Sequence, residues 1–320
     1  MSNNSVYLVT GAMGCLGAWT LRHLVEQGKK TVSLDVSENR HRLNLRLAPQ
    51  EQQAITFEQC DLREFEQVKS VFERHKITHV IHLAALQVPF CRADPVMGAQ
   101  VNVVGTVNIF EAARQLEIGH VSQASSIAVY GPAESYPTGL IKHDAPFDPR
   151  TLYGVYKQAT EGIGRIYWQD HQLSSITLRP YTVYGVGRDQ GLTSEPTKAM
   201  LAAVQSKPYV INFGGRMQFQ MASDVARYFI LAAEKKIEGA MGYNLGGPLT
   251  SVEDVAKIIM GIRNDSKIEV EETQLPFPEG FDDTMLKQQL PMQETSLEDG
   301  IEQTMLHFEA CLADGRLSPE

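Results

Sequence analysis

The chain has 320 residues, of which 43% are hydrophobic and 21% charged, and its net charge is −9. This composition is typical of one large or two medium globular domains, and it excludes a disordered, collagen-like or coiled-coil chain. An acidic chain without basic clusters favours neither nucleic acid nor an anionic membrane surface. No apolar run reaches the roughly 18 residues of a membrane span, and no basic region precedes the first apolar run, so we expect neither a transmembrane helix nor a signal peptide.

Four cysteines are scattered along the chain without C-x-x-C spacing, and no His, Asp or Glu residues cluster at metal-ligand spacing. We therefore expect no disulfide and no metal site, and a protein of the reducing cytoplasm. His82, at the end of an expected strand, is interpreted as a hydrogen-bonded core residue. The cysteines are Cys15, Cys60, Cys91 and Cys311.

The first 180 residues alternate between short apolar runs typical of strands and longer helical patterns. Strands separated by helices indicate βαβ units and a parallel sheet. Right-handed crossovers then predict an α/β fold with a doubly wound, Rossmann-type sheet. The expected strands are Val6–Thr10, Thr31–Leu34, Ile55–Gln59, His79–Leu83, His120–Ala124 and Ser175–Leu178. The expected helices are Leu16–Gln27, Glu64–His75, Gln100–Leu116 and Leu152–His171.

After residue 180 the loops become longer and richer in Gly and Pro. We expect residues 181–320 to form mainly a smaller C-terminal lobe over the carboxyl edge of the sheet, and we allow for the chain crossing back into the sheet. Ser251 and Ser296 stand where each can cap a helix. The expected helices are Pro196–Gln205, Ser223–Ala233, Val252–Arg263 and Ser296–Leu312.

The first expected strand runs directly into the segment TGAMGCLG at residues 10–17. Gly11, Gly14 and Gly17 allow a tight turn, a close approach of the backbone to a pyrophosphate and close packing of helix on strand. The helix that follows presents free N–H groups and the positive end of its dipole. Because the glycines follow a strand and open a helix, they predict a dinucleotide site rather than a simple turn.

Asp35 ends the second expected strand, 18 residues after Gly17. A carboxylate at this distance typically accepts hydrogen bonds from the ribose hydroxyls of adenosine and repels a 2′-phosphate. We therefore expect NAD rather than NADP, and we interpret residues 1–180 as the NAD-binding Rossmann domain. The alternative is that Asp35 only caps a following helix at Ser37–Leu45.

Tyr153 and Lys157 lie four residues apart in the segment YGVYK, so a helix places both on one face. A nearby ammonium favours the tyrosinate and makes Tyr153 a candidate general base. Ser125 and Ser126 follow the strand His120–Ala124, at the end of the sheet where doubly wound folds bind ligands. A hydroxyl there can donate to the substrate oxygen that gains or loses a proton. Each motif alone is weak, but with the glycine loop they indicate a site.

With these residues in place, nearly the whole chain resembles the extended short-chain dehydrogenases/reductases, in the branch of NAD-dependent epimerases and dehydratases. The order and spacing of nine segments carry this resemblance. They are TGAMGCLG (10–17), Asp35, Asp61-Leu62, HLAA (82–85), SSIAVYG (125–131), YGVYK (153–157), LRPYTVYGVGRDQG (178–191), SDVAR (223–227) and YNLGG (243–247).

The resemblance implies that Tyr153 is the acid/base, that Lys157 binds the nicotinamide ribose and lowers the pKa of Tyr153, and that Ser126 is the catalytic serine. It also implies contacts along the whole cofactor, with the pyrophosphate at the glycine loop and the nicotinamide near Pro180 and Val183. The expected NAD-binding residues are Gly11, Met13, Gly14, Cys15, Leu16, Gly17, Asp35, Asp61, Leu62, Leu83, Ala84, Ala85, Asn102, Tyr153, Lys157, Pro180 and Val183.

Two departures from the family pattern bear on the substrate. Dehydratases of this family carry an acidic pair where this chain has Ile127 and Ala128, so dehydration is not expected. Nucleotide-sugar members usually carry an Arg at the position of Met217, beside Arg216, where it binds the sugar diphosphate. Arg188 is a second candidate anion anchor, since a guanidinium pairs with phosphate or carboxylate, while the alternative for either arginine is a plain surface charge. The expected substrate-binding residues, partly in the C-terminal lobe, are Gln87, Ser126, Arg188 and Arg216.

Three functions remain open. The first is an NAD-dependent epimerase acting on a sugar hydroxyl, in particular of a nucleotide-linked sugar. The second is an NAD-dependent dehydrogenase of a free sugar, sugar acid or small hydroxy acid, and the third is an NAD-binding regulator without turnover. The retained Tyr153 and Lys157 argue against the third. In this family the helices at the positions of Gln100–Leu116 and Leu152–His171 commonly pair between subunits, so the resemblance implies a homodimer. The expected binding partner is a sugar-type small molecule, and neither nucleic acid nor a membrane is expected.

Overall fold

The computed structural model, which describes residues 5–318, confirms the Rossmann-type parallel sheet. Its seven strands follow the order β10-β6-β5-β4-β1-β2-β3, and every neighbouring pair is parallel. All six predicted strands are present close to their predicted bounds, and a seventh, β10, was not predicted. The strands are β1 (Val6–Thr10), β2 (Lys30–Asp35), β3 (Ile55–Gln59), β4 (His79–His82), β5 (His120–Ala124), β6 (Ser174–Arg179) and β10 (Ala240–Asn244).

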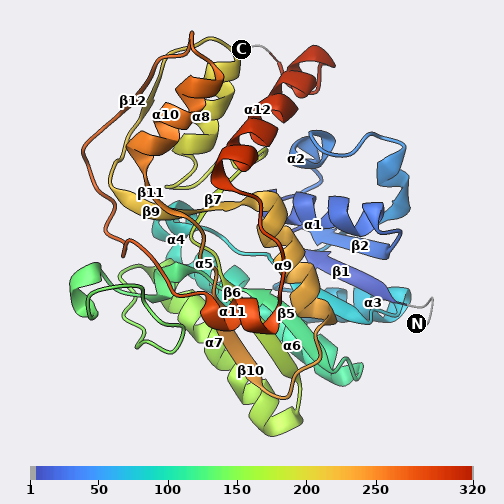
Figure 1. Ribbon diagram of the computed structural model, residues 1–320. Coiled ribbons are helices and arrows are strands. Elements are labelled where there is room, and N and C mark those ends of the chain that lie inside the picture. The colour runs from blue at the N-terminus through green and yellow to red at the C-terminus, as the bar shows by residue number, and fades with distance from the viewer. Residues whose placement is uncertain (1–4, 319–320) are drawn as a thin grey trace.

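Helices cover both faces of this sheet (Figure 1). On one face α1 (Cys15–Glu26) packs beside α9 (Ala222–Glu234), and on the other α3 (Phe65–His75), α6 (Gly105–Gln115) and α7 (Leu152–His171) pack in a row. A π-helical turn, η2 (Gln100–Val104), leads into α6. Because both faces are covered, the central strands are buried along most of their length, and every residue of β6 is buried.

The direction of the chain across the sheet reverses between β1 and β4. From β1 the chain adds β2 and β3 on one side, and it then returns to add β4, β5 and β6 on the other. The loops that leave β1 and β4 therefore diverge, which opens a crevice at the carboxyl ends of these two strands. The fold places the glycine loop, which follows β1, at one edge of this crevice.

The C-terminal lobe contains five short strands beyond the predicted helices. Strands β7 (Thr182–Tyr184), β9 (Arg216–Met221) and β11 (Leu249–Ser251) form one sheet, and β8 (Tyr209–Ile211) pairs with β12 (Ile268–Val270). The predicted helices are present as α8 (Glu195–Val204), α9, α10 (Val252–Ile262) and α12 (Leu297–Ala313). The remaining short helices are α2 (His41–Asn44), η1 (Glu51–Ala54), α4 (Val88–Ala93), α5 (Pro95–Ala99), η3 (Ile127–Val129), η4 (Ala133–Ser135) and α11 (Thr284–Gln289).

Both predicted serine caps are formed. The Ser251 hydroxyl accepts a hydrogen bond from Asp254 N at 3.0 Å, and the Ser296 hydroxyl accepts one from Asp299 N at 3.1 Å. Across residues 5–318, no helix has the length and apolar character that a membrane span requires.

The chain beyond residue 180 contributes to the sheet as well as to the lobe. Helix α9 packs against β4, β5 and β6, and β10 pairs in parallel with β6 (Figure 1). Residue 180 therefore does not separate two independently packed units.

A buried ion pair joins α7 to the ends of β6 and β10. Arg179 Nε and Nη2 donate to the Glu161 carboxylate at 2.8 and 2.6 Å, and the two side chains are only 4% and 10% exposed. Arg179 Nη1 donates to the Tyr130 hydroxyl, the His143 carbonyl and Asn244 Oδ1. The guanidinium is thus shared by three segments far apart in the sequence.

Removing one partner of this pair leaves a buried charge without compensation. We expect Glu161→Ala to lower the free energy of unfolding at pH 7 by about 3–5 kcal/mol. Glu73→Ala is the control, since Glu73 is half exposed and contacts Lys69 at 3.9 Å on α3, and it should cost about 0.5 kcal/mol or less. Urea unfolding measures both, and equal effects would contradict the prediction.

Candidate active site

A cavity of about 700 Å³ lies at the carboxyl edge of the sheet, between the Rossmann unit and the C-terminal lobe. It brings together residues from the ends of β1, β2, β4 and β5, from α7 and from the loop that follows β7. The predicted site residues that line it are Gly11, Met13, Gly14, Cys15, Leu16, Gly17, Asp35, Asp61, Leu62, Leu83, Ala84, Ala85, Gln87, Ser126, Tyr153, Lys157, Pro180, Val183 and Arg188.

The glycine loop has the shape that a pyrophosphate requires. Gly11 has φ +64°, and a Cβ there would lie 2.7 Å from the backbone of Ala84. A Cβ on Gly17 would overlap the Gly11 carbonyl, so α1 can begin directly beneath the loop. No side chain caps the first turn of α1, and its residues line the cavity. The cradle therefore fits a phosphate group bound by backbone N–H groups.

Asp35 connects β2 to the glycine loop. Its Oδ2 accepts a hydrogen bond from Met13 N and its Oδ1 accepts one from Ser37 N, both at 2.9 Å. The short helix α2 begins only at His41, and the Asp35 side chain does not cap it. The carboxylate lines the cavity with remaining lone pairs for ribose hydroxyls. The geometry agrees with an adenosine ribose site and not with the alternative of a helix cap.

Two structural details bring Tyr153 to the end of β5. Thr151 caps α7 by accepting a hydrogen bond from Gly154 N at 3.0 Å. A Cβ on Gly154 would overlap the Ala128 carbonyl, so only glycine lets α7 start against η3. Ser126, the N-cap of η3, accepts a hydrogen bond from Ala128 N at 3.2 Å, and its hydroxyl bonds to Tyr153. The predicted serine and tyrosine are therefore adjacent.

Lys157 is buried below the tyrosine, with only 4% of the residue exposed. Its Nζ donates a hydrogen bond of 2.6 Å to the Ala124 carbonyl at the end of β5. Burial lowers the pKa of Lys157 to about 8, while the nearby Glu161 carboxylate opposes this shift. Lys157 is thus close to losing its charge near neutral pH.

The electrostatics of Tyr153 differ from the expectation in one respect. Burial raises the pKa of Tyr153 to about 12, and the opposing influences come from the Ser126 hydrogen bond and the Arg188 guanidinium. The Lys157 ammonium is directed to the Ala124 carbonyl and lies 5.8 Å from the centre of the tyrosine ring. The part that the resemblance gives Lys157 in lowering the pKa of Tyr153 stays a prediction.

Arg188 projects into the cavity near Tyr153. Its Nη2 donates to Thr193 Oγ1 at 3.3 Å, and its Nε is buried without a hydrogen-bond partner. Burial lowers the pKa of Arg188. A Cβ on Gly191 would lie 2.6 Å from Gln87 Oε1 and 2.9 Å from Arg188 Nη2, so both predicted substrate residues meet at this point. The site has an unused donor where an anion can bind.

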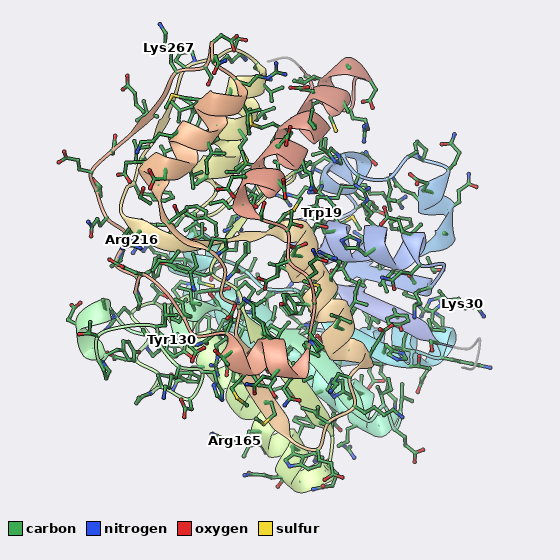
Figure 2. All side chains as sticks on the ribbon, viewed as in Figure 1. Trp19, Lys30, Tyr130, Arg165, Arg216 and Lys267 are labelled. Atoms are coloured by element: carbon green, nitrogen blue, oxygen red, sulfur yellow. The ribbon has the colours of Figure 1, made fainter. Side chains whose placement is uncertain are left out.

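Two predicted contact residues lie outside the lining of this cavity. Arg216 is exposed at the start of β9; Figure 2 shows it at the left of the view. Asn102 is 1% exposed. Its amide pairs with the backbone of Leu86 through hydrogen bonds of 2.7 and 2.9 Å, so it positions the segment after β4. The contacts of Arg216 with substrate and of Asn102 with the cofactor stay predictions.

His82 is the hydrogen-bonded core residue that was expected. Its ring nitrogens contact the Thr10 and Thr106 hydroxyls at 2.7 and 2.9 Å. Burial lowers the pKa of His82 to about 3, so the ring is neutral. Thr10 Oγ1 also accepts hydrogen bonds from Leu83 N and Ala84 N. This chain of hydroxyls holds the cavity-lining end of β4 against β1.

Several lining residues were not predicted. Arg42 and His41 enter the cavity wall from α2 and bind Asp189, whereas Arg63 pairs with Asp61 and lowers the pKa of that carboxyl. No sequence pattern identifies Arg42 and His41, because their partner Asp189 lies 147 residues from Arg42 along the chain. The unpredicted residues at the Arg188 end are Phe90, Tyr181, Gln190, Leu192, Thr193 and Phe277.

Comparison with known proteins assigns the family. Residues 7–246 match the model of the NAD dependent epimerase/dehydratase family. A UDP-glucose 4-epimerase of Mycolicibacterium smegmatis is 30% identical over 262 residues, which cover 79% of this chain and 81% of that protein.

Solved structures agree in fold over nearly the whole chain. A Thermus thermophilus UDP-glucose 4-epimerase in complex with NAD has a TM-score of 0.78 and 25% identity, covering 96% of this chain and 100% of that one. An L-threonine dehydrogenase of Cupriavidus necator has a TM-score of 0.82 and 23% identity, covering 93% and 98%. The chain therefore belongs to the NAD-dependent epimerase/dehydratase family, as an enzyme whose cofactor is NAD.

Proposed function

We propose that the protein is an NAD-dependent dehydrogenase that oxidises a hydroxyl of a small sugar acid or hydroxy acid. The observation that carries this proposal is Arg188, whose guanidinium faces the candidate base Tyr153 across the cavity. An anionic group held by Arg188 would leave the rest of a small substrate close to the tyrosine hydroxyl.

Arg188 differs from the other arginines of the cavity wall. Three arginines line the cavity, and two of them are paired: Arg42 with Asp189 and Arg63 with Asp61. Arg188 has no ion pair with a carboxylate within 4 Å among the described residues, and its Nε is unpartnered. A buried guanidinium of this kind gains most from a ligand carboxylate or phosphate.

Strand β9 argues against a nucleotide diphosphate as the anionic group. Met217, which stands where nucleotide-sugar members usually carry Arg, is 2% exposed and accepts a hydrogen bond from Thr182. Gln218 binds the backbone of Phe281, and Gln220 binds the backbones of Tyr181, Leu245 and Gly246. No β9 side chain lines the cavity. The strand therefore offers no ligand to a diphosphate.

The residues divide the chemistry among them. Bound NAD supplies the hydride acceptor. Tyr153 accepts the proton of the substrate hydroxyl, and Ser126 donates a hydrogen bond that stabilises the developing charge on oxygen. Lys157, held by the Ala124 carbonyl, is placed to bind the nicotinamide ribose. We propose that the other predicted NAD-binding residues that line the cavity also contact the cofactor.

The second candidate is epimerisation of a nucleotide-linked sugar, because relatives named UDP-glucose 4-epimerase match most of the chain. A screen at 340 nm with NAD separates the two functions. Its substrates are glycerate, gluconate, galacturonate, UDP-glucose and UDP-glucuronate. Net NADH formation with an acid supports the proposal, whereas conversion of a UDP-sugar without net NADH overturns it.

Tyr153→Phe is the control for this screen. It removes the proton acceptor and leaves the glycine loop and Asp35 unchanged. We expect it to lower turnover by about 10²–10⁴-fold while NAD still binds in calorimetry. More than a tenth of wild-type turnover would contradict the role of Tyr153.

We also infer a homodimer formed through η2, α6 and α7. Leu152, Val155 and Ile166 on α7 and Val104 on η2 are each 44–48% exposed, which is unusual for large apolar side chains that remain in water. This inference stays a prediction.

The burial of the Lys157 ammonium should lower the free energy of unfolding of the wild-type protein. Its pKa is about 8 in the folded protein and about 10.4 when unfolded. Between these values only the unfolded chain holds the proton, so wild-type stability rises as the pH passes from 8 to 10. We expect Lys157→Met to raise the free energy of unfolding of the cofactor-free protein by about 1–2 kcal/mol at pH 7. This gain should shrink towards pH 10. Urea unfolding at several pH values measures this difference. A Lys157→Met variant that is less stable than the wild type at every pH would refute the prediction.

Arg188→Ala should raise the substrate KM by roughly ten- to a hundredfold, because a charged hydrogen bond contributes about 1.5–3 kcal/mol. NAD affinity should hardly change. Arg188→Lys should restore KM only in part, since an ammonium cannot form the bidentate fork. Steady-state kinetics with the acid that gives the highest NADH rate provides the measurement, and an unchanged KM in Arg188→Ala would show that the anion binds elsewhere.

A further inference from the structure

The segment Gly185–Gly191, here called the anchor loop, carries Arg188 and rests on side chains of the Rossmann unit. Trp19 Nε1 on α1 donates a hydrogen bond of 3.1 Å to the Val186 carbonyl. Arg46, just after α2, packs against Gly187, where a Cβ would lie 2.7 Å from Arg46 Nη2. The base of the anchor loop is therefore held from the side of the cofactor site.

The tip of the anchor loop is held by an ion pair. Arg42 Nε lies 3.0 Å from both Asp189 oxygens, and Arg42 Nη2 lies 2.7 Å from Oδ1. His41 Nε2 contacts Asp189 Oδ2 at 3.1 Å. Arg42 Nη1 also donates to the Met13 carbonyl at 3.3 Å. One guanidinium thus joins the glycine loop to the residue next to Arg188.

The segment that carries Arg42 is itself fixed from behind. The Leu45 carbonyl, at the end of α2, accepts hydrogen bonds from His307 Nε2 on α12 at 2.6 Å and from Arg316 Nη1 at 2.8 Å. The Arg42 backbone carbonyl accepts one from Arg46 Nη1 at 2.7 Å. Arg42 is therefore presented from a segment that other contacts hold in place, and Asp189 is the partner on the anchor loop.

We propose that Arg42 and Asp189 are positioning residues that set the place of Arg188, and thereby the affinity for the substrate anion. Asp189 does not line the cavity, so it acts through the loop and not by contact. This inference rests on the proposed role of Arg188 as the substrate anchor. It adds that α2 and the glycine loop, which border the cavity, help to build the substrate site through one ion pair.

The pair is peripheral enough to be removed without unfolding the protein. The Asp189 side chain is 42% exposed and that of Arg42 14%. Partly exposed pairs contribute about 0.2–1 kcal/mol to stability. We therefore expect Asp189→Asn and Arg42→Gln to fold, with urea midpoints close to that of the wild type.

The first test is hydrogen exchange of the anchor loop, which needs no substrate. In NAD-loaded protein, Asp189→Asn should speed exchange of the loop amides about fivefold, as expected for the loss of roughly 1 kcal/mol of local stability. Glu26→Gln is the matched control, because Glu26 pairs with Arg22 at 2.7 Å on the surface of α1. Equal exchange in Asp189→Asn and the wild type overturns the inference.

The second test is a double-mutant cycle on KM with the most active acid among glycerate, gluconate and galacturonate. Asp189→Asn should raise KM about two- to fivefold and leave kcat within twofold. The same change in the Arg188→Ala background should have no further effect, since neighbouring residues that act as a unit are not additive. Arg42→Lys should restore part of the affinity lost in Arg42→Gln.

The outcomes distinguish this inference from the proposed function. An equal rise in KM in both backgrounds means that Asp189 does not act through Arg188, which overturns the inference. An unchanged KM in Arg188→Ala overturns the anchor itself. If none of the three acids yields NADH, the proposed function fails, and hydrogen exchange alone decides whether the pair orders the loop.

Discussion

The hydrogen bond from Lys157 Nζ to the Ala124 carbonyl is the contact on which the site depends. It joins the middle of α7 to the last residue of β5 at 2.6 Å. With that contact made, Tyr153 one turn earlier on α7 must lie over the turn that follows β5, where Ser126 stands. The ammonium is buried for this purpose, and the Arg179–Glu161 pair holds the same helix one turn further along. The geometry of the candidate base is thus a property of helix packing, not of a flexible loop.

A second set of contacts keeps the other wall of the cavity in place. Thr10, His82 and Thr106 link the ends of β1 and β4 to the start of α6, and Asn102 fixes the backbone beyond β4. All of these side chains have hydrogen-bond partners, which makes a buried polar network rigid rather than costly. The two strands that border the crevice are therefore held at a constant separation.

Most of the Rossmann unit was predictable because its signals are local. The glycine loop combines spacing, a preceding strand and a following helix within eight residues of sequence. The position of Asn102 and Arg216 outside the cavity was not predictable, because family position does not reveal which way a side chain points. The Arg42–Asp189 pair was not predicted, since its partners lie 147 residues apart and neither belongs to a pattern. Strand β10 is short and contains glycine, so its place beside β6 depends on pairing and not on its own propensity.

The late return of the chain to the sheet has a consequence for synthesis. Nascent protein that has reached residue 180 contains six of the seven strands, but its fully buried strand β6 is an open edge until Ala240–Asn244 emerges. Helix α9, which covers β4, β5 and β6, is missing over the same interval. An uncovered sheet with a free edge invites pairing between chains. The emerging polypeptide therefore exposes an edge that is open to such pairing while residues 180 to 244 are being made.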